Sequence, residues 1–382
     1  MTAQYINYLI EGSLSQFFKK HKFNIYKIMK VCVVNPDFYR SSGVTVAIKR
    51  IHASVADFGI ENFFVTCSDK NQAEDNSWMP AGTLSMFQLM SLNIFILLPE
   101  IFLFFSWVRR NKINVIHVHH RRLAIIFKIF GFLFRGSILY TGNLTYRFSF
   151  LFWLFSPSQA VAVSKSVEIN IRKTTRTSQI DVIGNPTVFP DDCPHMDLEK
   201  VRNRAICVAR LDPVKSHGYL IEAWHLLISK GYKYELILIG EGSLKQSLQD
   251  RVKELQLDSS VIFKGYTSDV NAQFSNCLFS ILVSEVEGQG IVTIEAASAG
   301  RASLLTDVDG SRDCLPPVGA MPNGLVHGDV TALANALEYW FTHPESVMQE
   351  GQIFFDFHKN TNSADAVGPK YVSLYRHLVE NY

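Results

Sequence analysis

Short apolar runs alternate with longer segments of helical pattern through most of this 382-residue chain, from Lys30 onward. Such alternation is typical of parallel sheets that carry helices on both faces. A chain of this length also exceeds the size of most single cores. We therefore predict an α/β protein with two doubly wound, Rossmann-like domains. The predicted strands form two series, at 30–35, 62–67, 113–118, 137–141, 159–163 and 180–184, and then at 204–209, 234–239, 260–264, 277–283 and 302–306.

A segment rich in Pro and Asp, between Gly184 and Pro194, separates the two series of strands and marks the predicted domain boundary. Met29 directly precedes the first strand, so the residues before it are expected to be either an appendage or the product of an upstream start that is not used. The expected parts are an N-terminal extension (1–28), a first domain (29–190), a second domain (191–355) and a closing segment with a helix that crosses back to the first domain (356–382).

The two halves of the chain differ strongly in charge. Residues 1–190 hold 21 Lys and Arg against 10 Asp and Glu, whereas residues 191–382 hold 16 against 25. A basic half can meet nucleic acid, an anionic membrane or an anionic substrate, but no nucleic-acid-binding motif accompanies it. We expect a membrane face or an anionic substrate, and no nucleic acid.

Apolar runs in the first half bear on membrane contact. Residues 91–108 approach the length of a membrane span, but Pro99 and Glu100 interrupt them, which favours a core or interfacial helix. Phe-rich runs at 123–134 and 148–155, flanked by Arg and Lys, support the interfacial interpretation. The scattered cysteines, without a C-x-x-C pair, fit a reducing cytosol. The expected location is cytoplasmic, with peripheral contact to the inner face of the plasma membrane.

An acidic, glycine-rich turn precedes a helix expected from Ile291. Gly288 and Gly290 permit positive φ and a close approach of backbone to a ligand, and the first helical N–H groups attract anions. Glu287 on the loop and Glu295 one turn inside the helix can face one pocket, which suits a ligand with phosphate and hydroxyl groups. The alternative is a loop carboxylate and a Glu that stabilises the helix dipole.

Arg210 and Lys215 flank a Pro-containing turn at the carboxyl end of a predicted strand. Together they suit a diphosphate, Arg by bidentate contact and Lys as a point charge, unless they are solvated surface cations. Gly43, after the first strand, either lets a backbone amide approach a phosphate or is a simple turn glycine. The loop lacks a GxGxxG fingerprint, which disfavours a dinucleotide-binding fold.

Alternation along the strand at 113–118 puts His117 and His119 on one face, which a zinc site can use. No third ligand is readable nearby. Structural histidines, or an active-site role for His119 or His120, are therefore favoured over a metal site.

These features, in this order, resemble glycosyltransferase family 4 of the bacterial surface-polysaccharide type, whose members are retaining enzymes with the GT-B fold. In that fold two Rossmann-like domains face a central cleft. The resemblance covers about 30–340 and rests on 208–211 with Lys215, 238–242, 263–266, the Glu287 and Glu295 pair, and 306–310.

The resemblance implies a donor site. Arg210 and Lys215 would neutralise the donor diphosphate, Glu295 would accept hydrogen bonds from the ribose, and Glu287 would hold hydroxyls of the transferred sugar. Further donor contacts are implied for Gly43, for the main-chain amides of Gln289, Gly290 and Ile291, and for a base-binding segment at Gly265 and Tyr266. Asp307 and Asp309 imitate a metal-binding D-x-D, but their place matches a donor-side turn of this family, so no metal is expected.

One departure concerns a histidine that the family commonly carries in a Thr-x-His turn. This chain has Asn143 there, which can hydrogen-bond a sugar hydroxyl but cannot exchange a proton near neutral pH. Either that histidine is dispensable, or His119 or His120 substitutes for it, or activity is lost.

The resemblance implies a hexosyltransferase that moves a sugar from a UDP- or GDP-linked donor to a glycan or polyprenyl-linked glycan, in O-antigen, capsule or exopolysaccharide synthesis. Two alternatives stay open. One is a nucleotide-sugar epimerase of the same architecture, which would need paired acid–base residues. The other is a degenerate glycan-binding homologue, suggested by Asn143.

Overall fold

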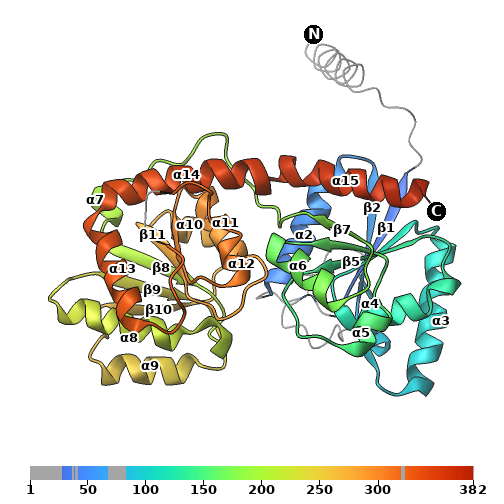
Figure 1. The fold of residues 1–382 in the computed structure, drawn as a ribbon, viewed down its shortest axis with the longest axis horizontal. Coiled ribbons are helices and arrows are strands. Elements are labelled where there is room, and N and C mark those ends of the chain that lie inside the picture. The colour runs from blue at the N-terminus through green and yellow to red at the C-terminus, as the bar shows by residue number, and fades with distance from the viewer. Residues whose placement is uncertain (1–27, 37, 39–41, 68–82, 320–322, 382) are drawn as a thin grey trace, which may run out of the picture.

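The computed structural model describes residues 28–36, 38, 42–67, 83–319 and 323–381, so the expected extension lies, apart from Ile28, outside the described residues. The described part forms two α/β domains that lie side by side, each built on a parallel sheet (Figure 1). The predicted fold class of two doubly wound, Rossmann-like domains is confirmed.

The first domain contains a parallel sheet of seven strands in the order β3-β2-β1-β4-β5-β6-β7. The apolar runs became strands within about two residues of the predicted bounds, whereas the two-residue edge strand β3 was not predicted. The strands are β1 (Met29–Asn35), β2 (Ile60–Thr66), β3 (Leu84–Ser85), β4 (Val115–Val118), β5 (Ser137–Gly142), β6 (Gln159–Ala162) and β7 (Gln179–Val182).

Helices cover both faces of this sheet. On one face, Phe104 and Phe127 stack at 4.8 Å between ring centroids and belong to a buried apolar cluster. On the other face, Ile48 and Ile51 pack with Tyr371 from the end of the chain. The helices of the first half are α2 (Gly43–Ala56), α3 (Ile94–Arg110), α4 (Arg121–Ile129), α5 (Phe150–Leu154) and α6 (Lys165–Thr174).

The second domain has a five-stranded parallel sheet in the order β10-β9-β8-β11-β12. Its core is built around the fully buried Trp224 and Trp340. The strands are β8 (Arg204–Val208), β9 (Glu235–Ile239), β10 (Val261–Gly265), β11 (Phe279–Leu282) and β12 (Ser303–Leu305). The helices are α7 (Leu198–Val201), α8 (His217–Ser229), α9 (Lys245–Glu254), α10 (Val270–Phe274), α11 (Ile291–Ser298), α12 (Asp309–Arg312), α13 (Val330–Thr342) and α14 (Pro344–Asn362).

The last two helices run along one edge of both domains (Figure 1). α14 packs against α11 of the second domain, and α15 (Ala364–Glu380) packs against α2 of the first. Ser363 separates them: its extended backbone ends α14, and its side chain caps α15 by accepting a hydrogen bond from the Ala366 N–H at 3.1 Å. The chain therefore returns to the domain where it began.

The apolar run at 91–108 became α3, which keeps Pro99 inside the helix. Its inward face is buried, through Leu97, Ile101 and Phe104 among others. Among the described helices, none combines the length and the apolar character needed to cross a bilayer.

Candidate active site

Both sheets place loops with polar side chains at their switch points. In the first sheet the strand order reverses between β1 and β4, and in the second between β8 and β11. Ligands of doubly wound sheets bind beyond the carboxyl ends of the strands at such points. Arg210 and Lys215 follow β8, and Glu287 follows β11, so the second domain brings the predicted donor residues to one edge.

Lys215 and Glu287 form a partly buried ion pair. The Lys215 ammonium contacts Oε1 of Glu287, whose residue is only 7% exposed. The Ser284 hydroxyl donates to the same oxygen at 2.8 Å. The Glu285 N–H also donates to the Val214 carbonyl at 2.9 Å, which ties the Lys215 loop to the acidic turn. The lysine predicted to bind the diphosphate therefore contacts the carboxylate predicted to hold the sugar.

Glu295 is paired with a residue that the sequence did not single out. Arg50, on α2 of the first domain, places Nη2 2.5 Å from Oε1 of Glu295. Its Nη1 donates to the Thr187 hydroxyl at 3.0 Å, in the segment that connects the domains. The carboxylate expected to bind a ribose is thus held by an arginine from the opposite domain.

Each carboxylate keeps one oxygen for a ligand. In Glu287 and in Glu295 the protein partners bond to Oε1. Within the described residues no hydrogen bond reaches Oε2 of either side chain. A carboxylate oxygen accepts hydrogen bonds only, so these two atoms are suited to hydroxyl donors such as those of a ribose or a sugar.

The other predicted donor residues are placed as follows. Arg210 has a side chain that is 55% exposed, and its guanidinium pairs with Asp212 at 2.9 Å. Gly265 ends β10 at φ +72°, a left-handed conformation that favours glycine, and it is followed by the half-buried Tyr266. Gly43 begins α2 opposite Ile291: a Cβ at Gly43 would lie 3.6 Å from the Ile291 side chain.

The two glycines of the acidic turn do not use the positive φ that they permit. Gly290 has φ −69°, and Gly288 is not among the glycines with positive φ. Gly288 is required by packing instead, because a Cβ there would lie 1.8 Å from the Asn143 carbonyl oxygen. Its own carbonyl accepts a hydrogen bond from the Ser164 hydroxyl at 2.6 Å. At Gly288, the close backbone approach that was predicted for a ligand is therefore made to Asn143 and Ser164 of the first domain.

Gln289 and Asn143 make contacts within the protein. The Gln289 side-chain oxygen accepts from the Asn185 N–H at 2.7 Å, in the connection between the domains. The Asn143 side-chain amide donates to the carbonyls of His119 and Thr141 at 3.4 and 3.3 Å. Asn143 therefore stands at the domain interface, beside the acidic turn.

His117 and His119 have a third neighbour, His52 on α2, which the sequence did not predict. The ligand atoms of these three buried residues lie within 4.8 Å of one another. Burial lowers the pKa of His117 and His119, and lowers that of His52 to about 4, so the rings are neutral at physiological pH.

A metal would have to displace a partner of His117. His117 is already bonded through Nδ1 to the Tyr375 hydroxyl at 2.8 Å and through Nε2 to the Thr141 hydroxyl at 2.6 Å. The His117 and His119 ring centroids lie 4.3 Å apart with planes inclined by 36°, which is closer to stacking than to convergence on one ion. We assign the cluster to the core. His120 precedes α4, where burial and then the charges of Arg121 and Arg122 lower its pKa.

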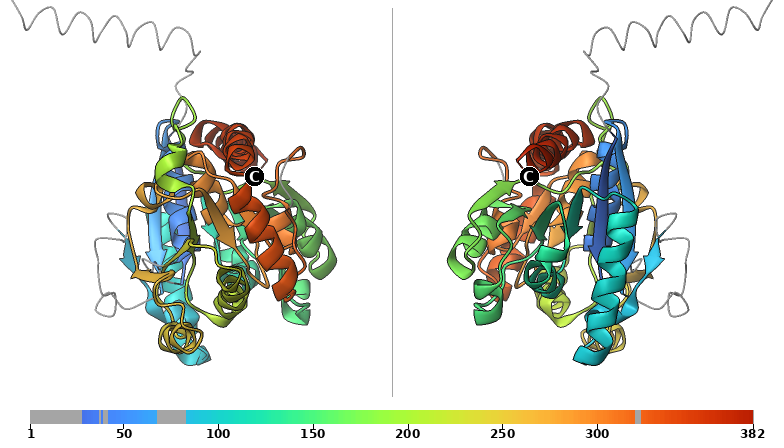
Figure 2. Two further views of the ribbon diagram at one scale, coloured as in Figure 1. Left: turned by 90° about the vertical axis from the view of Figure 1, so that its left-hand side faces the viewer. Right: turned by 90° about the vertical axis from the view of Figure 1, so that its right-hand side faces the viewer.

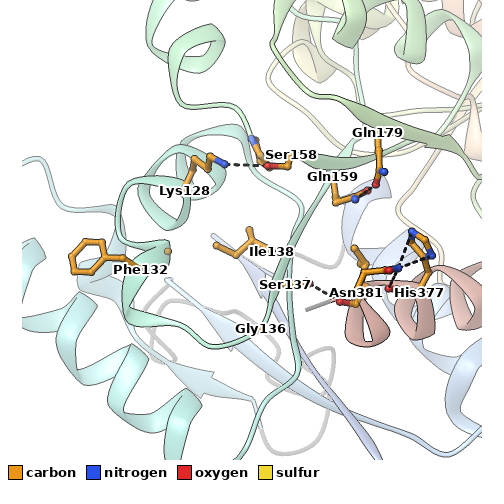
Figure 3. Close-up of a pocket in the computed structure, with 13 residues that line it drawn as sticks. Lys128, Phe132, Gly136, Ser137, Ile138, Ser158, Gln159, Gln179, His377 and Asn381 are labelled. Carbon is orange, nitrogen blue, oxygen red and sulfur yellow. Dashed lines mark hydrogen bonds between the residues drawn. The ribbon is translucent and has the colours of Figure 1, made fainter.

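A cavity of about 670 Å³ lies elsewhere, at the amino-terminal ends of β5 and β6 and against α15. Figure 3 shows Lys128 there, bonded to Ser158, and Ser137, bonded to the main chain near the end of α15. Because ligands of such sheets bind at the opposite ends of the strands, this cavity is not our candidate active site.

The second domain matches a known protein family. Residues 196–352 fit the family described as "Glycosyl transferases group 1". Curated relatives include an uncharacterized glycosyltransferase of Haemophilus influenzae, 26% identical over 46% of this chain, and a poly(ribitol-phosphate) alpha-N-acetylglucosaminyltransferase of Staphylococcus aureus, 24% identical over 39%.

A third relative is a Campylobacter jejuni enzyme, N-acetylgalactosamine-N,N'-diacetylbacillosaminyl-diphospho-undecaprenol 4-alpha-N-acetylgalactosaminyltransferase, which is 30% identical over 33% of this chain. The matched regions cover 49%, 29% and 38% of the lengths of the H. influenzae, S. aureus and C. jejuni relatives, so the chain spans half or less of each.

Solved structures resemble the whole chain. The Anabaena protein HepE in complex with UDP is 16% identical, with a TM-score of 0.75 over 92% of this chain and all of the other. A variant of S. aureus TarM with UDP and alpha-GlcNAc-glycerol is 11% identical, with a TM-score of 0.75 over 91% of this chain and 99% of the other. At these identities the likeness shows the fold alone. The family match thus covers the second domain, and the chain shares the GT-B fold of these solved structures.

Proposed function

We propose that the chain is a retaining glycosyltransferase of family 4 that moves a sugar from a nucleotide-diphosphate donor to a glycan or lipid-linked glycan of a bacterial surface polysaccharide. The observation that carries this proposal is the placement of Glu287 and Glu295. Both are nearly buried at the carboxyl edge of the second sheet, both keep Oε2 unbonded among the described residues, and Lys215 lies against the first of them. Relatives that act on undecaprenol-linked or polyol-phosphate acceptors support the choice of acceptor class.

In the proposed mechanism each residue has a separate task. Lys215 and Arg210 neutralise the charge that develops on the diphosphate as its bond to the sugar breaks, which is electrostatic stabilisation of the transition state. Glu287 Oε2 accepts hydrogen bonds from the transferred sugar, and Glu295 Oε2 accepts them from the ribose. The base, uracil or guanine, lies near Gly265 and Tyr266, and no metal ion takes part.

The first domain supplies the acceptor side. Asn143 meets the acidic turn from the first sheet, and it can bind a sugar hydroxyl without exchanging a proton. His119 is only 5% exposed, with a pKa lowered by burial, so it acts as a neutral group. Deprotonation of the acceptor then falls to the departing diphosphate.

Donor binding is the first test. A panel of UDP- and GDP-sugars is screened by thermal shift on the full chain and on Glu295→Ala, Arg210→Ala and Glu285→Ala. Loss of a hydrogen bond to an ionised group weakens binding by roughly 10- to 100-fold. We expect that loss in the first two variants. Glu285, an exposed acid of the same turn, is the matched control and should leave the shift unchanged.

Product analysis then tests the reaction. With the donor that binds and a glycan or polyprenyl-linked acceptor, we expect a new glycoside of the donor's anomeric configuration. A product of opposite configuration would refute retention, and an epimer formed without acceptor would indicate the epimerase. Donor binding without any product would favour the degenerate homologue.

A further inference from the structure

Large apolar side chains are exposed at one end of the first domain. They form two groups, one at the start of α3 and one around the start of α5. We call these six residues the apolar tip, and their exposed fractions are Leu92 90%, Ile94 49%, Phe95 84%, Phe148 61%, Phe150 61% and Leu151 59%.

Two arginines in the first turn of α4 join the two groups. Arg122 donates from Nη2 to the carbonyl of Ser91 at 2.9 Å, next to the α3 group. Arg121 donates to the carbonyl of Arg147 at 3.4 Å, next to the α5 group. Figure 1 shows α3, α4 and α5 together at the lower right of the first domain, and in the right-hand view of Figure 2 α3 lies on the outside. The apolar tip is therefore one surface.

α3 is apolar on its outer face as well as its inner one. Phe104 and Ile101 are fully buried against the sheet, whereas Phe95, Phe102 and Leu103 point outward and are more than half exposed. A surface helix normally carries polar residues on its solvent side, and a helix that is apolar all round is normally covered. This outer face is therefore suited to an apolar environment.

Three cations, Arg121, Arg122 and Arg147, lie next to the apolar tip. Between residues 91 and 155 the chain has eight Lys and Arg and a single acid, Glu100. In the part of the chain that the structure describes, none of these eight forms an ion pair. Exposed aromatic and aliphatic side chains beside unpaired cations are the combination with which interfacial segments bind anionic lipid headgroups and the outer part of the acyl region.

The apolar tip lies at the edge of the first sheet where its strands end. α4 begins directly after His119 and His120, which follow β4. The segment that leads to α5 begins at Asn143, which follows β5 and contacts Gly288 of the second domain. A bilayer at this position would face the acceptor side of the site. This part of the inference rests on the proposed function, because it requires a lipid-linked acceptor.

We propose that the apolar tip, with Arg121, Arg122 and Arg147, docks the protein on the surface of a bilayer that contains anionic phospholipids. The apolar side chains enter the headgroup boundary and the guanidinium groups bind the phosphates. The protein is thus peripheral on the inner face of the plasma membrane and presents its cleft to acceptors anchored in that membrane.

Vesicle co-sedimentation tests the proposal. We expect the full chain to bind vesicles of phosphatidylglycerol and phosphatidylcholine at about 0.1 M salt, and to bind less at about 1 M, where the screening length falls from ~10 to ~3 Å. Replacing both Phe95 and Phe148 with Glu should weaken binding at least about tenfold, because a buried Phe contributes about that factor or more. The matched control is Val318→Glu, at an equally exposed site (76%) of the second domain, which should bind like the parent chain.

Three results would overturn the proposal. The first is that the folded full chain fails to bind anionic vesicles. The second is that the double variant binds them as well as the parent chain. The third is that light scattering finds a dimer that the double variant loses, while neither protein binds vesicles. The nucleotide-sugar thermal shift, measured on the same proteins, separates the two proposals. Donor binding without vesicle binding refutes only the membrane surface, and vesicle binding without donor binding refutes only the proposed function.

Discussion

Arg50 on α2 and Glu295 on α11 form an ion pair that joins the two domains, with Nη2 and Oε1 2.5 Å apart. The residues are separated by 245 positions in the chain. Because Glu295 is also the proposed ribose ligand, one carboxylate serves both the domain interface and the donor site.

Arg50→Ala should destabilise the chain by about 1–3 kcal/mol, since the nearly buried Glu295 loses a charged partner. Denaturant unfolding followed by Trp fluorescence measures this loss. In a double-mutant cycle, adding Glu295→Ala should cost less than the sum of the single changes. The exposed pair of Lys245 and Glu241 is the control, and Lys245→Ala should change stability by no more than about 0.5 kcal/mol. Strict additivity of Arg50→Ala and Glu295→Ala would refute the coupling.

Substitutions of Lys215 and Arg210 should have different effects on stability but the same effect on donor binding. Lys215→Ala leaves Glu287 nearly buried without its cation, and we expect the free energy of unfolding to fall by about 1–3 kcal/mol. Arg210 is more than half exposed, so Arg210→Ala should change it by about 0.5 kcal/mol or less. Both variants should lose the thermal shift with the donor. An equal loss of stability in the two variants would contradict this reading of the site.

Gly288→Ala should disturb the interface between the domains, because its Cβ would lie 1.8 Å from the Asn143 carbonyl oxygen. Overpacking of this kind costs about 1–3 kcal/mol, and transfer activity should fall with it. Gly218→Ala is the matched control: it lies in α8 with nothing within 4 Å of the added Cβ, and it should be neutral or stabilise by about 0.5–1 kcal/mol. Wild-type stability and activity in Gly288→Ala would mean that the domains do not meet at this glycine in solution.

His358 makes stability depend on pH. It is buried against Cys314 and Asn362, and burial lowers its pKa from 6.5 to about 4. Below pH 6.5 the unfolded chain takes up a proton that the folded chain does not. The free energy of unfolding should therefore fall by about 1.4 kcal/mol per pH unit for this group as pH falls from 6.5 towards 4, and be unaffected by it above 6.5.

The pH slope is measured by denaturant unfolding between those limits. His358→Gln should have a shallower slope than the parent chain, and the exposed His195→Gln should match the parent. His52 and His217, whose pKa values burial also lowers to about 4, keep part of the slope in every variant. An unchanged slope in His358→Gln would refute the assignment.

The local sequence pattern predicted the main strands and the part of the site that lies in the second domain. The apolar runs were long enough and sufficiently separated to define the sheets. Lys215 and Glu287 lie on loops after neighbouring strands, which brings the cation and the first carboxylate to the same edge. A strand predicted at 277–283 was found at Phe279–Leu282. These features depend on residues that are close in sequence, or on the rule that the carboxyl ends of parallel strands lie at the same edge of a sheet.

Contacts between distant segments could not be predicted in this way. Arg50 lies on an amphipathic helix, where an arginine is indistinguishable from a solvated cation until the second domain is placed against it. His52 is equally remote from His117 and His119. For Gly288 the sequence left positive φ and a close backbone approach open, and it could not show that the close neighbour is Asn143 of the first domain.

The two covalent connections between the domains are fastened to each other. Thr187, in the first connection, forms a bridge with Ser363, at the junction of α14 and α15, and the Asn362 side chain donates to the Asn185 carbonyl at 3.1 Å. The chain thus crosses between the domains twice at nearly the same place, and the two crossings are bonded to each other. The covalent links between the domains are therefore gathered along one line, next to the junction of α14 and α15, and the Arg50–Glu295 pair adds a non-covalent tie between α2 and α11.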